Sequence, residues 1–374
     1  MNVQFNSTNL RIARLAQDLS IAELGDLTGK SRQYIARIET GIDLPSSTMV
    51  DCLSENLDVA PDFFYNQTGR QLDDNVFHFR KLATTKNVDK LSAIAKVELF
   101  SRFFGTIENR LTLPKYDFPS IDCTTAEDIE RAAESCRSQW GLGMGPISNC
   151  VRLMENAGAV VTSFNSNQSI DALSILSARP IVVINKAESA CRVRFDHGHE
   201  CGHFVMHFGK QTGDQATEAE ANRFSSALLM PRSTFAREFP ALRGRGQINW
   251  KAIVELKFRW KTSKAAILYR AKQLSLISDS MYKHALLSGL YGRGQRTVEY
   301  EDDQIAVDEP ELLPNSLAIL QKNYGITANS LGQEINVGQK MLRKILPIGM
   351  IENQLPDPVN SNNVLFGNFR KVST

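Results

Sequence analysis

The sequence lacks the features of a membrane-spanning or disulfide-stabilised protein. No run of about 18 apolar residues occurs, so no transmembrane helix is expected. The first six residues lack the basic start and apolar core of a signal peptide. Six scattered cysteines form no CxxC pair, which favours free thiols in a reducing cytoplasm. A net charge of only +2 gives no bulk indication of a polyanionic partner.

The composition is that of an ordinary globular protein of more than one domain. Hydrophobic residues make up 42% of the chain and charged residues 22%. At 374 residues the chain is too long for one average domain, so two or three are expected.

Residues 1–65 predict an all-α domain. Apolar periodicity indicates short helices over 10–16, 21–27, 31–38 and 49–57, and Pro61 begins a last turn. Ser20 and Glu23 have the spacing of a capping box. The second and third helices are joined by a turn that contains Gly29, which is the helix-turn-helix arrangement.

The third of these helices is the candidate DNA-reading element. In a helix-turn-helix domain the second helix of the pair enters the major groove with its N-terminal residues toward the bases. The candidate contacts here are Ser31, Arg32, Gln33 and Tyr34, then Arg37 one turn later, with Lys30 and Arg14 on phosphates.

The charge of this domain argues against strong DNA affinity. Residues 1–64 contain five Lys/Arg and nine Asp/Glu, a net charge of −4. Phosphate contacts dominate affinity, so an acidic domain is a poor non-specific binder. DNA binding, homodimerisation and recognition of a similar module on another protein all remain open.

The remainder of the chain is α+β and mostly helical. Residues 66–124 form a helical linker region, with a polar stretch at 66–74 and one long helix over 88–111. Residues 125–290 are expected to form a domain with a small sheet. Its predicted helices are 126–140, 146–158, 192–208 and 218–229, and its predicted strands are 159–161, 172–176 and 180–184.

An acidic stretch separates this domain from a predicted C-terminal module. Seven carboxylates lie within residues 299–311, and the pattern predicts a solvated linker over 291–314. Residues 315–374 predict a small helical module, with a polar and poorly ordered tail after Pro356.

The strongest functional motif is His199-Glu200-Cys201-Gly202-His203. Histidines four apart on a helix place both imidazoles on one face, where they can share one Zn²⁺. Glu200 would act as the general base. A surface helix that carries two histidines by chance explains neither the apolar strand before the motif nor the acidic helix after it. Gly202 would permit close helix packing.

A catalytic zinc needs a third protein ligand. Glu218 and Glu220 are the candidates, and they lie about 200° apart around their helix, so both cannot face one ion. We expect Glu218 to be the ligand, with Glu220 as the alternative. Asn222 lies on the face of Glu218 and would hydrogen-bond a ligand histidine.

The other candidates near the motif are weaker. His207 lies on the histidine face one turn further on, where it would polarise substrate or stabilise an oxyanion, although a packed histidine fits equally well. His197 is weaker still. Cys201 points away from the metal face and is expected to be a buried thiol.

These stretches resemble the ImmA/IrrE metallopeptidase family, and residues 1–64 resemble an XRE-type (Cro/repressor-like) helix-turn-helix domain. The family resemblance rests on 179–185, the motif helix through His207, and the segment from Glu218 to Pro231. It implies a zincin-like, gluzincin-type peptidase domain over 125–290, with His199, His203 and Glu218 as ligands and Glu200 as catalytic acid/base. The chain departs from the family pattern at 196–198 and at Cys201, which leaves redox sensitivity open.

The resemblance also implies a biological role. Such proteins cleave a helix-turn-helix repressor and thereby derepress genes in stress, phage or mobile-element responses. A cytoplasmic zinc endopeptidase that acts on a repressor-type protein, with DNA as a further partner and a possible homodimer, is therefore expected. The alternative is a DNA-binding regulator whose peptidase-like domain senses a ligand or metal without catalysis.

Overall fold

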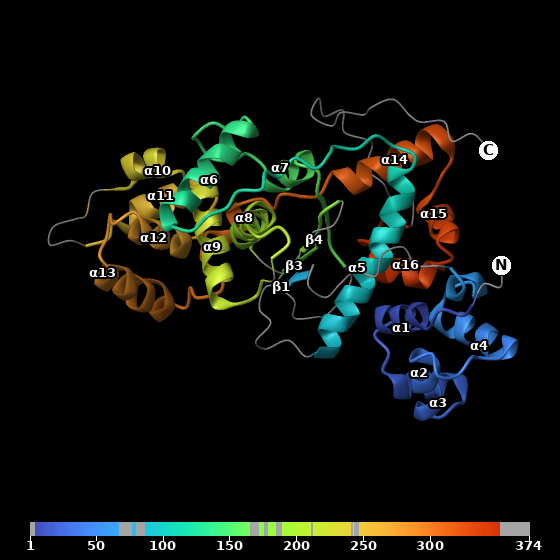
Figure 1. Ribbon diagram of the computed structural model, residues 1–374. Helices are drawn as coiled ribbons and strands as arrows, with labels where there is room; N and C mark the ends of the chain where they lie inside the picture. Colours follow the sequence, from blue (N-terminus) through green and yellow to red (C-terminus); the bar gives the residue numbers. More distant parts are fainter. Residues whose placement is uncertain are drawn as a thin grey trace. The chain divides into compact units, whose positions relative to one another are not determined.

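The computed structural model describes residues 4–66, 77–79, 87–164, 172–175, 179–184, 189–210, 212–240, 242 and 247–351 (Figure 1). The chain divides into two compact units. The first contains residues 1–114, 160–175 and 311–374, and the second contains 115–159 and 176–310. The expected class, α+β and mostly helical with a small sheet, is confirmed.

The first unit begins with the predicted helix-turn-helix domain. Its elements are α1 (Ser7–Ala16), α2 (Ile21–Thr28), α3 (Arg32–Glu39), α4 (Ser47–Leu57) and the 3₁₀ turn η1 (Pro61–Phe64). The Ser20–Glu23 capping box forms, and Gly29 ends α2 with φ 66°, a left-handed conformation that suits glycine. Gly25 permits the tight turn, because a Cβ there would lie 2.8 Å from the Lys30 carbonyl oxygen.

The remaining elements of the first unit come from three separate parts of the chain. They are β1 (Phe77–Phe79), α5 (Asn87–Glu108), β2 (Val160–Thr162), β3 (Ala172–Ile175), α14 (Leu312–Tyr324), α15 (Ala328–Glu334) and α16 (Gln339–Ile345). β1, which the sequence did not predict, pairs antiparallel with β3, with Phe77 opposite Ile175 and Phe79 opposite Leu173.

Helices α15 and α16 of the first unit pack against α5, and an isolated β-bridge joins Val337, between these two helices, to Val59 just after α4. Asp58 makes this connection with both its backbone and its side chain. Its carbonyl accepts from the Gly338 N–H at 2.8 Å, and its carboxylate accepts from the Met341 N–H at 2.8 Å, inside the first turn of α16. Buried Lys96 of α5 binds Asp18 at 2.6 Å. Residues 311–351 therefore share a compact unit with the helix-turn-helix domain.

The second unit is built around a helix pair. Its elements are α6 (Ala126–Gln139), α7 (Cys150–Asn156), β4 (Ile181–Ile184), α8 (Ala190–Met206), α9 (Gln215–Leu229), α10 (Arg232–Glu238), α11 (Trp250–Trp260), α12 (Lys264–Gln273), α13 (Asp279–His284), the π-helical turn η3 (Ala285–Leu290), and the 3₁₀ turns η4 (Tyr291–Arg293) and η5 (Asp302–Gln304). α8 packs along α9, with α6 against the other side of α9 (Figure 1).

The largest error in a predicted helix start is at α7. The helix expected over 146–158 begins only at Cys150, because the Asn149 side chain accepts from the Arg152 N–H at 2.8 Å and caps α7 there. The preceding Ile147 carbonyl instead accepts from Arg194 at 2.5 Å.

The prediction that residues 299–311 are solvated is wrong for Glu299, Asp302 and Asp308. Lys257 is fully buried and binds Glu299 at 2.7 Å and Asp302 at 2.5 Å. Asp308 accepts from the Cys150 N–H at 2.8 Å and forms a buried ion pair with Arg194 of α8. The carboxylates neutralise cations that the helices bury, which the local sequence of the stretch cannot reveal.

Two further predictions lie outside the described residues. Most of the polar stretch at 66–74 and all of the tail after Pro356 belong to the segments for which no structure is given. Within the part of the chain that is described, no helix has both the length and the apolar character needed to cross a membrane.

Candidate metal centre

The HExxH motif lies in the C-terminal half of α8, where every side chain from Asp196 to His207 is buried. His199 and His203 are one turn apart, with ring centroids 4.7 Å from each other. Their Nε2 atoms face each other at 3.0 Å. The predicted common face of the two imidazoles is therefore present.

Glu218 in the first turn of α9 completes a three-residue group with these histidines. Its two carboxylate oxygens lie 3.3 Å from His199 Nε2 and 3.4 Å from His203 Nε2. The side chain is 28% exposed, so this carboxylate lies on the open side of the group. Burial alone would raise the pKa of Glu218, but hydrogen bonds from the two histidines outweigh it and hold the pKa below its usual range.

The close approach of α8 and α9 depends on two glycines. A Cβ on Gly198 would lie 2.5 Å from Ser225 Oγ and 3.2 Å from its Cα. A Cβ on Gly202 would lie 3.2 Å from the Cα of Ala221. Ser225 Oγ donates to the Phe195 carbonyl at 2.7 Å across the same contact. The packing role predicted for Gly202 is present, and Gly198, which the sequence reasoning missed, could have been found from its i,i−4 spacing.

Buried arginines fix the C-terminal end of α9. Arg137 donates to the Leu228 carbonyl at 2.5 Å, and Arg270 donates to the Met230 carbonyl at 2.9 Å. Cations at carbonyls that the helix leaves unpaired are favourable, both for hydrogen bonding and for the helix dipole. These hydrogen bonds at the C-terminal end of α9 help to fix the position of the helix that carries Glu218 in its first turn.

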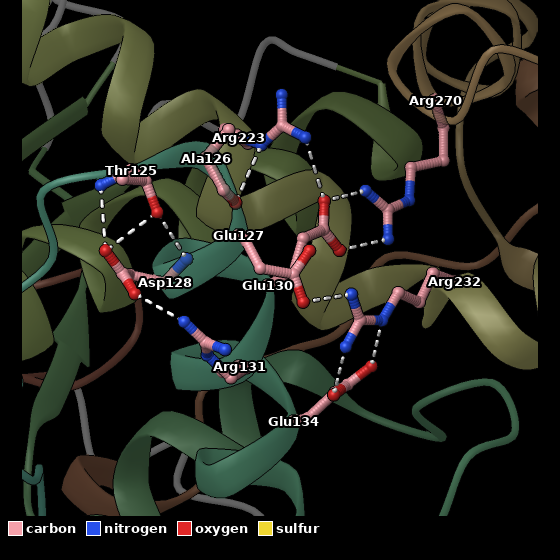
Figure 2. A network of polar contacts seen from close by, with 10 residues as sticks. All are labelled: Thr125, Ala126, Glu127, Asp128, Glu130, Arg131, Glu134, Arg223, Arg232 and Arg270. Atoms are coloured by element: carbon pink, nitrogen blue, oxygen red, sulfur yellow. Dashed lines mark hydrogen bonds and ion pairs between the residues drawn. The ribbon is translucent and has the colours of Figure 1, made fainter.

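Figure 2 shows how Glu130 of α6 joins this support. Its carboxylate is buried and receives two hydrogen bonds of 2.7 Å from Arg270. Arg223 of α9 approaches the same carboxylate at 3.4 Å. Arg232 spans Glu127 and Glu134 on the exposed side of α6. Glu130 therefore links three helices, α6, α9 and α12.

The second nitrogen of each ligand histidine has its own partner. His199 Nδ1 lies 3.0 Å from Asn222 Oδ1, as the sequence predicted for Asn222. His203 Nδ1 lies 2.9 Å from His207 Nδ1, and His207 Nε2 lies 2.9 Å from the Glu220 carboxylate. Glu220, the alternative third ligand, thus contacts His207 and not the metal group.

The contacts of His207 do not match the substrate role expected for it. Both of its ring nitrogens have partners, so neither is left to polarise a substrate carbonyl. Burial lowers the pKa of His207, and the hydrogen bond to Glu220 opposes that effect.

The donor set fits a zinc ion. Two imidazole nitrogens and a carboxylate are a common set of three protein ligands for catalytic zinc. Bonds of about 2.0–2.1 Å to a tetrahedral ion place ligand atoms roughly 3.3–3.4 Å apart. The observed separations of 3.0, 3.3 and 3.4 Å are close to this. Both Nδ1 atoms have hydrogen-bond partners outside this group, so it is the two Nε2 atoms that face the Glu218 carboxylate.

His197, which precedes the motif, and Cys201, which lies within it, do not belong to the His-His-Glu group. His197 is buried, and its Nδ1 contacts the Val193 carbonyl at 2.7 Å. Burial lowers the pKa of His197 to about 4. Cys201 is fully buried, as predicted, and burial raises the pKa of its thiol well above the usual value. Since the thiolate is the reactive form, this environment disfavours oxidation.

The structure exposes most of the predicted DNA-contacting residues. Lys30, Ser31, Arg32 and Gln33 are exposed at the start of α3, and Tyr34 is half-buried. Arg37 is exposed, but its guanidinium is bound by Asp43 at 2.6 and 2.7 Å.

The phosphate contact expected of Arg14 is wrong. Its side chain is buried and donates to Glu39 at 3.0 Å and to the Leu19 carbonyl at 2.6 Å. It therefore holds α1 against the end of α3 instead of facing solvent.

The fold and the His-His-Glu group together define a metallopeptidase-like domain that accompanies a helix-turn-helix domain. Residues 154–272 match the family model described as the IrrE N-terminal-like domain, Peptidase_M78. Residues 10–64 match the helix-turn-helix family model HTH_3. The resemblance inferred from the sequence is confirmed for these two segments. A comparison with curated proteins gave no match.

Proposed function

We propose that the protein is a zinc-dependent endopeptidase that cleaves a regulatory, repressor-type protein. The observation that carries this proposal is the convergence of His199, His203 and Glu218, whose ligand atoms all lie within 4.8 Å of one another. The match of 154–272 to a peptidase family model supports the reaction class. His199, His203 and Glu218 are the proposed metal ligands.

A zinc ion held by His199, His203 and Glu218 would supply Lewis-acid polarisation of a peptide carbonyl and would lower the pKa of a water molecule. Glu200 is the next residue on the motif helix after His199. It is the proposed general base, taking a proton from the attacking water on its carboxylate and passing it to the leaving amine. Water adds to the carbonyl carbon, the C–N bond breaks, and an acid and an amine are the products. Asn222 holds His199 with its Nδ1–H directed away from the ligand side.

The helix-turn-helix domain is the proposed means of targeting. It brings the peptidase domain to DNA or to a protein that carries a similar module, which fits a repressor substrate. The exposed start of α3 supports a contact with a partner, and the net charge of −4 favours a specific contact over general DNA affinity. A role in a stress, phage or mobile-element response, in the cytoplasm, is part of the same proposal.

The test is cleavage of a panel of purified helix-turn-helix repressors by wild type and by Glu200→Gln. We expect the variant to keep its zinc and to lose about 10²–10⁴-fold in rate, the usual contribution of a general base. Arg131→Gln, an exposed change on α6, is the control and should cleave as wild type. A Glu200→Gln variant that cleaves at the wild-type rate would exclude the mechanism.

The second candidate is a regulator that binds DNA and senses a ligand or metal without catalysis. The observation that favours it is the burial of Glu200, which is 1% exposed. A general base has to contact the water that attacks the substrate. Burial of the Glu200 carboxylate in the free protein therefore favours a role in sensing over one in catalysis. Operator binding that responds to zinc, equal in wild type and Glu200→Gln, with no cleavage by either, would select this function.

A further inference from the structure

Three histidines form a continuous row along α8 and its C-cap. His199, His203 and His207 are four residues apart, and the ring centroids of the second and third are 5.1 Å from each other. The first two belong to the proposed metal group. The third is buried, lies outside that group, and has no role in the proposed reaction.

The hydrogen-bond directions in this row follow from the ligand atoms. If His203 binds the metal through Nε2, its ring proton is on Nδ1, because a neutral imidazole carries one N–H. That N–H donates to His207 Nδ1 at 2.9 Å. His207 then carries its own proton on Nε2, which donates to the Glu220 carboxylate at 2.9 Å. Each link thus fixes the proton position of the next.

The two ligand histidines are held by groups of different charge. His199 Nδ1 faces the neutral amide of Asn222 at 3.0 Å. His203 is connected through one imidazole to a carboxylate that is 39% exposed. A carboxylate that accepts from a ligand histidine orients the ring and makes it a stronger donor to the metal. Here the same effect is transmitted across His207.

We infer that His207 and Glu220 form a relay that orients His203 and strengthens its metal bond, so that α9 supports both ligand histidines. Glu218 binds the metal, Asn222 orients His199, and Glu220 orients His203 through His207. His207 is a positioning residue and touches no reacting atom. This inference rests on the proposed zinc site.

The test is the zinc affinity of the full-length protein, measured by competition with a chromophoric chelator. We expect His207→Ala to weaken zinc binding by about 10–100-fold, the usual cost of removing the partner of a ligand histidine. Glu220→Gln should weaken it by less, because the amide oxygen still accepts from His207. His207→Asn should restore part of the loss, because its amide oxygen can accept from His203 Nδ1.

A double-mutant cycle separates the relay from independent effects. In a His207→Ala background the relay is already broken, so Glu220→Gln should add nothing. The cobalt-substituted protein should show a shifted visible absorption spectrum in His207→Ala, which a loss of fold stability alone would not produce. Glu255→Gln, an exposed carboxylate on α11, is the charge control and should leave affinity and spectrum unchanged.

The outcomes distinguish this inference from the proposed function. If wild type binds zinc and His199→Ala does not, but His207→Ala and Glu220→Gln bind as wild type, the relay is wrong and the metal site stands. If the two changes weaken binding additively, the residues act separately and the relay is also wrong. If wild type binds no zinc, the metal site itself fails.

Discussion

The candidate metal centre and helix α3 differ in the burial of their polar side chains. At the candidate metal centre His199 and His203 are buried, each has a hydrogen-bond partner on Nδ1, and two arginines bind carbonyls at the C-terminal end of α9. On α3 the candidate contacts are exposed, and the guanidinium of Arg37 is bound by Asp43. The side chains proposed to hold an ion are buried and bound within the chain, whereas those proposed to contact a partner molecule are exposed.

The largest effect we expect is on stability, from a change in the second unit's acidic stretch. Asp308→Asn leaves the buried Arg194 of α8 without its carboxylate, which should lower the free energy of unfolding by about 3–5 kcal/mol. Chemical denaturation measures this loss. Asp303→Asn, an exposed carboxylate of the same stretch, is the matched control and should change stability by less than about 0.5 kcal/mol.

Equal stability in these two variants would mean that the stretch is a solvated linker after all. The Asp308–Arg194 ion pair would then not stabilise α8, which carries the histidines of the candidate metal centre. The difference in burial between this centre and α3 would be smaller.

The next effect is on the helix contact that brings Glu218 to the histidines. Gly198→Ala places a methyl group 2.5 Å from Ser225 Oγ, so α8 and α9 must shift. Overpacking of this kind should lower stability by about 1–3 kcal/mol and should weaken zinc binding, because Glu218 moves with α9. Chelator competition and denaturation measure the two effects.

Gly105→Ala in α5 is the matched glycine control, because a Cβ there meets nothing within 4 Å. It should raise stability by about 0.5–1 kcal/mol and leave zinc binding unchanged. Tight zinc binding by Gly198→Ala would show that the ligand geometry does not depend on this close approach.

A smaller effect is expected at α3, in the direction of tighter binding. Asp43→Asn frees the Arg37 guanidinium and removes one negative charge from an acidic domain, so it should increase DNA affinity by up to about fivefold. Arg32→Ala should reduce affinity without a loss of stability. Fluorescence anisotropy with a DNA duplex at two salt concentrations measures both. Identical affinity in the two variants would mean that this face of α3 contacts a protein and not DNA.

The smallest expected effect concerns the reaction of the cysteine thiols with a thiol reagent. Cys136, Cys150, Cys191 and Cys201 are buried, and burial raises the pKa of each thiol, to about 12, 11 and 12 for the first three. Only the partly exposed Cys52 and Cys123 should react with a thiol reagent in the native protein. Fast labelling of Cys201 would contradict the buried environment of the motif helix.

The features that could be predicted from the sequence are those that depend on residues close together in the chain. Helix positions in the first 64 residues followed from apolar spacing and from the Ser20–Glu23 capping box. The face shared by His199 and His203 followed from their i,i+4 spacing. The helical periodicity of α9 separated Glu218 from Glu220 for the same reason.

The sequence could not predict features that depend on distant residues. The carboxylates of 299–308 resemble a solvated run until Lys257, Lys264 and Arg194 are placed around them. The partnership of residues 311–351 with the helix-turn-helix domain depends on Asp58, almost 300 residues away from α16 in sequence. His207 has the right spacing to continue the histidine row, but its link to Glu220 required the fold.

The most direct test of the account is the zinc content of the purified protein without added metal, in wild type, His199→Ala and Glu218→Ala. The account predicts about one zinc per wild-type chain and little in either variant, since each removes one of three protein ligands. Loss in His199→Ala but full retention in Glu218→Ala would contradict the assignment of Glu218. A wild-type protein without zinc, even after reconstitution, would contradict the metal centre itself.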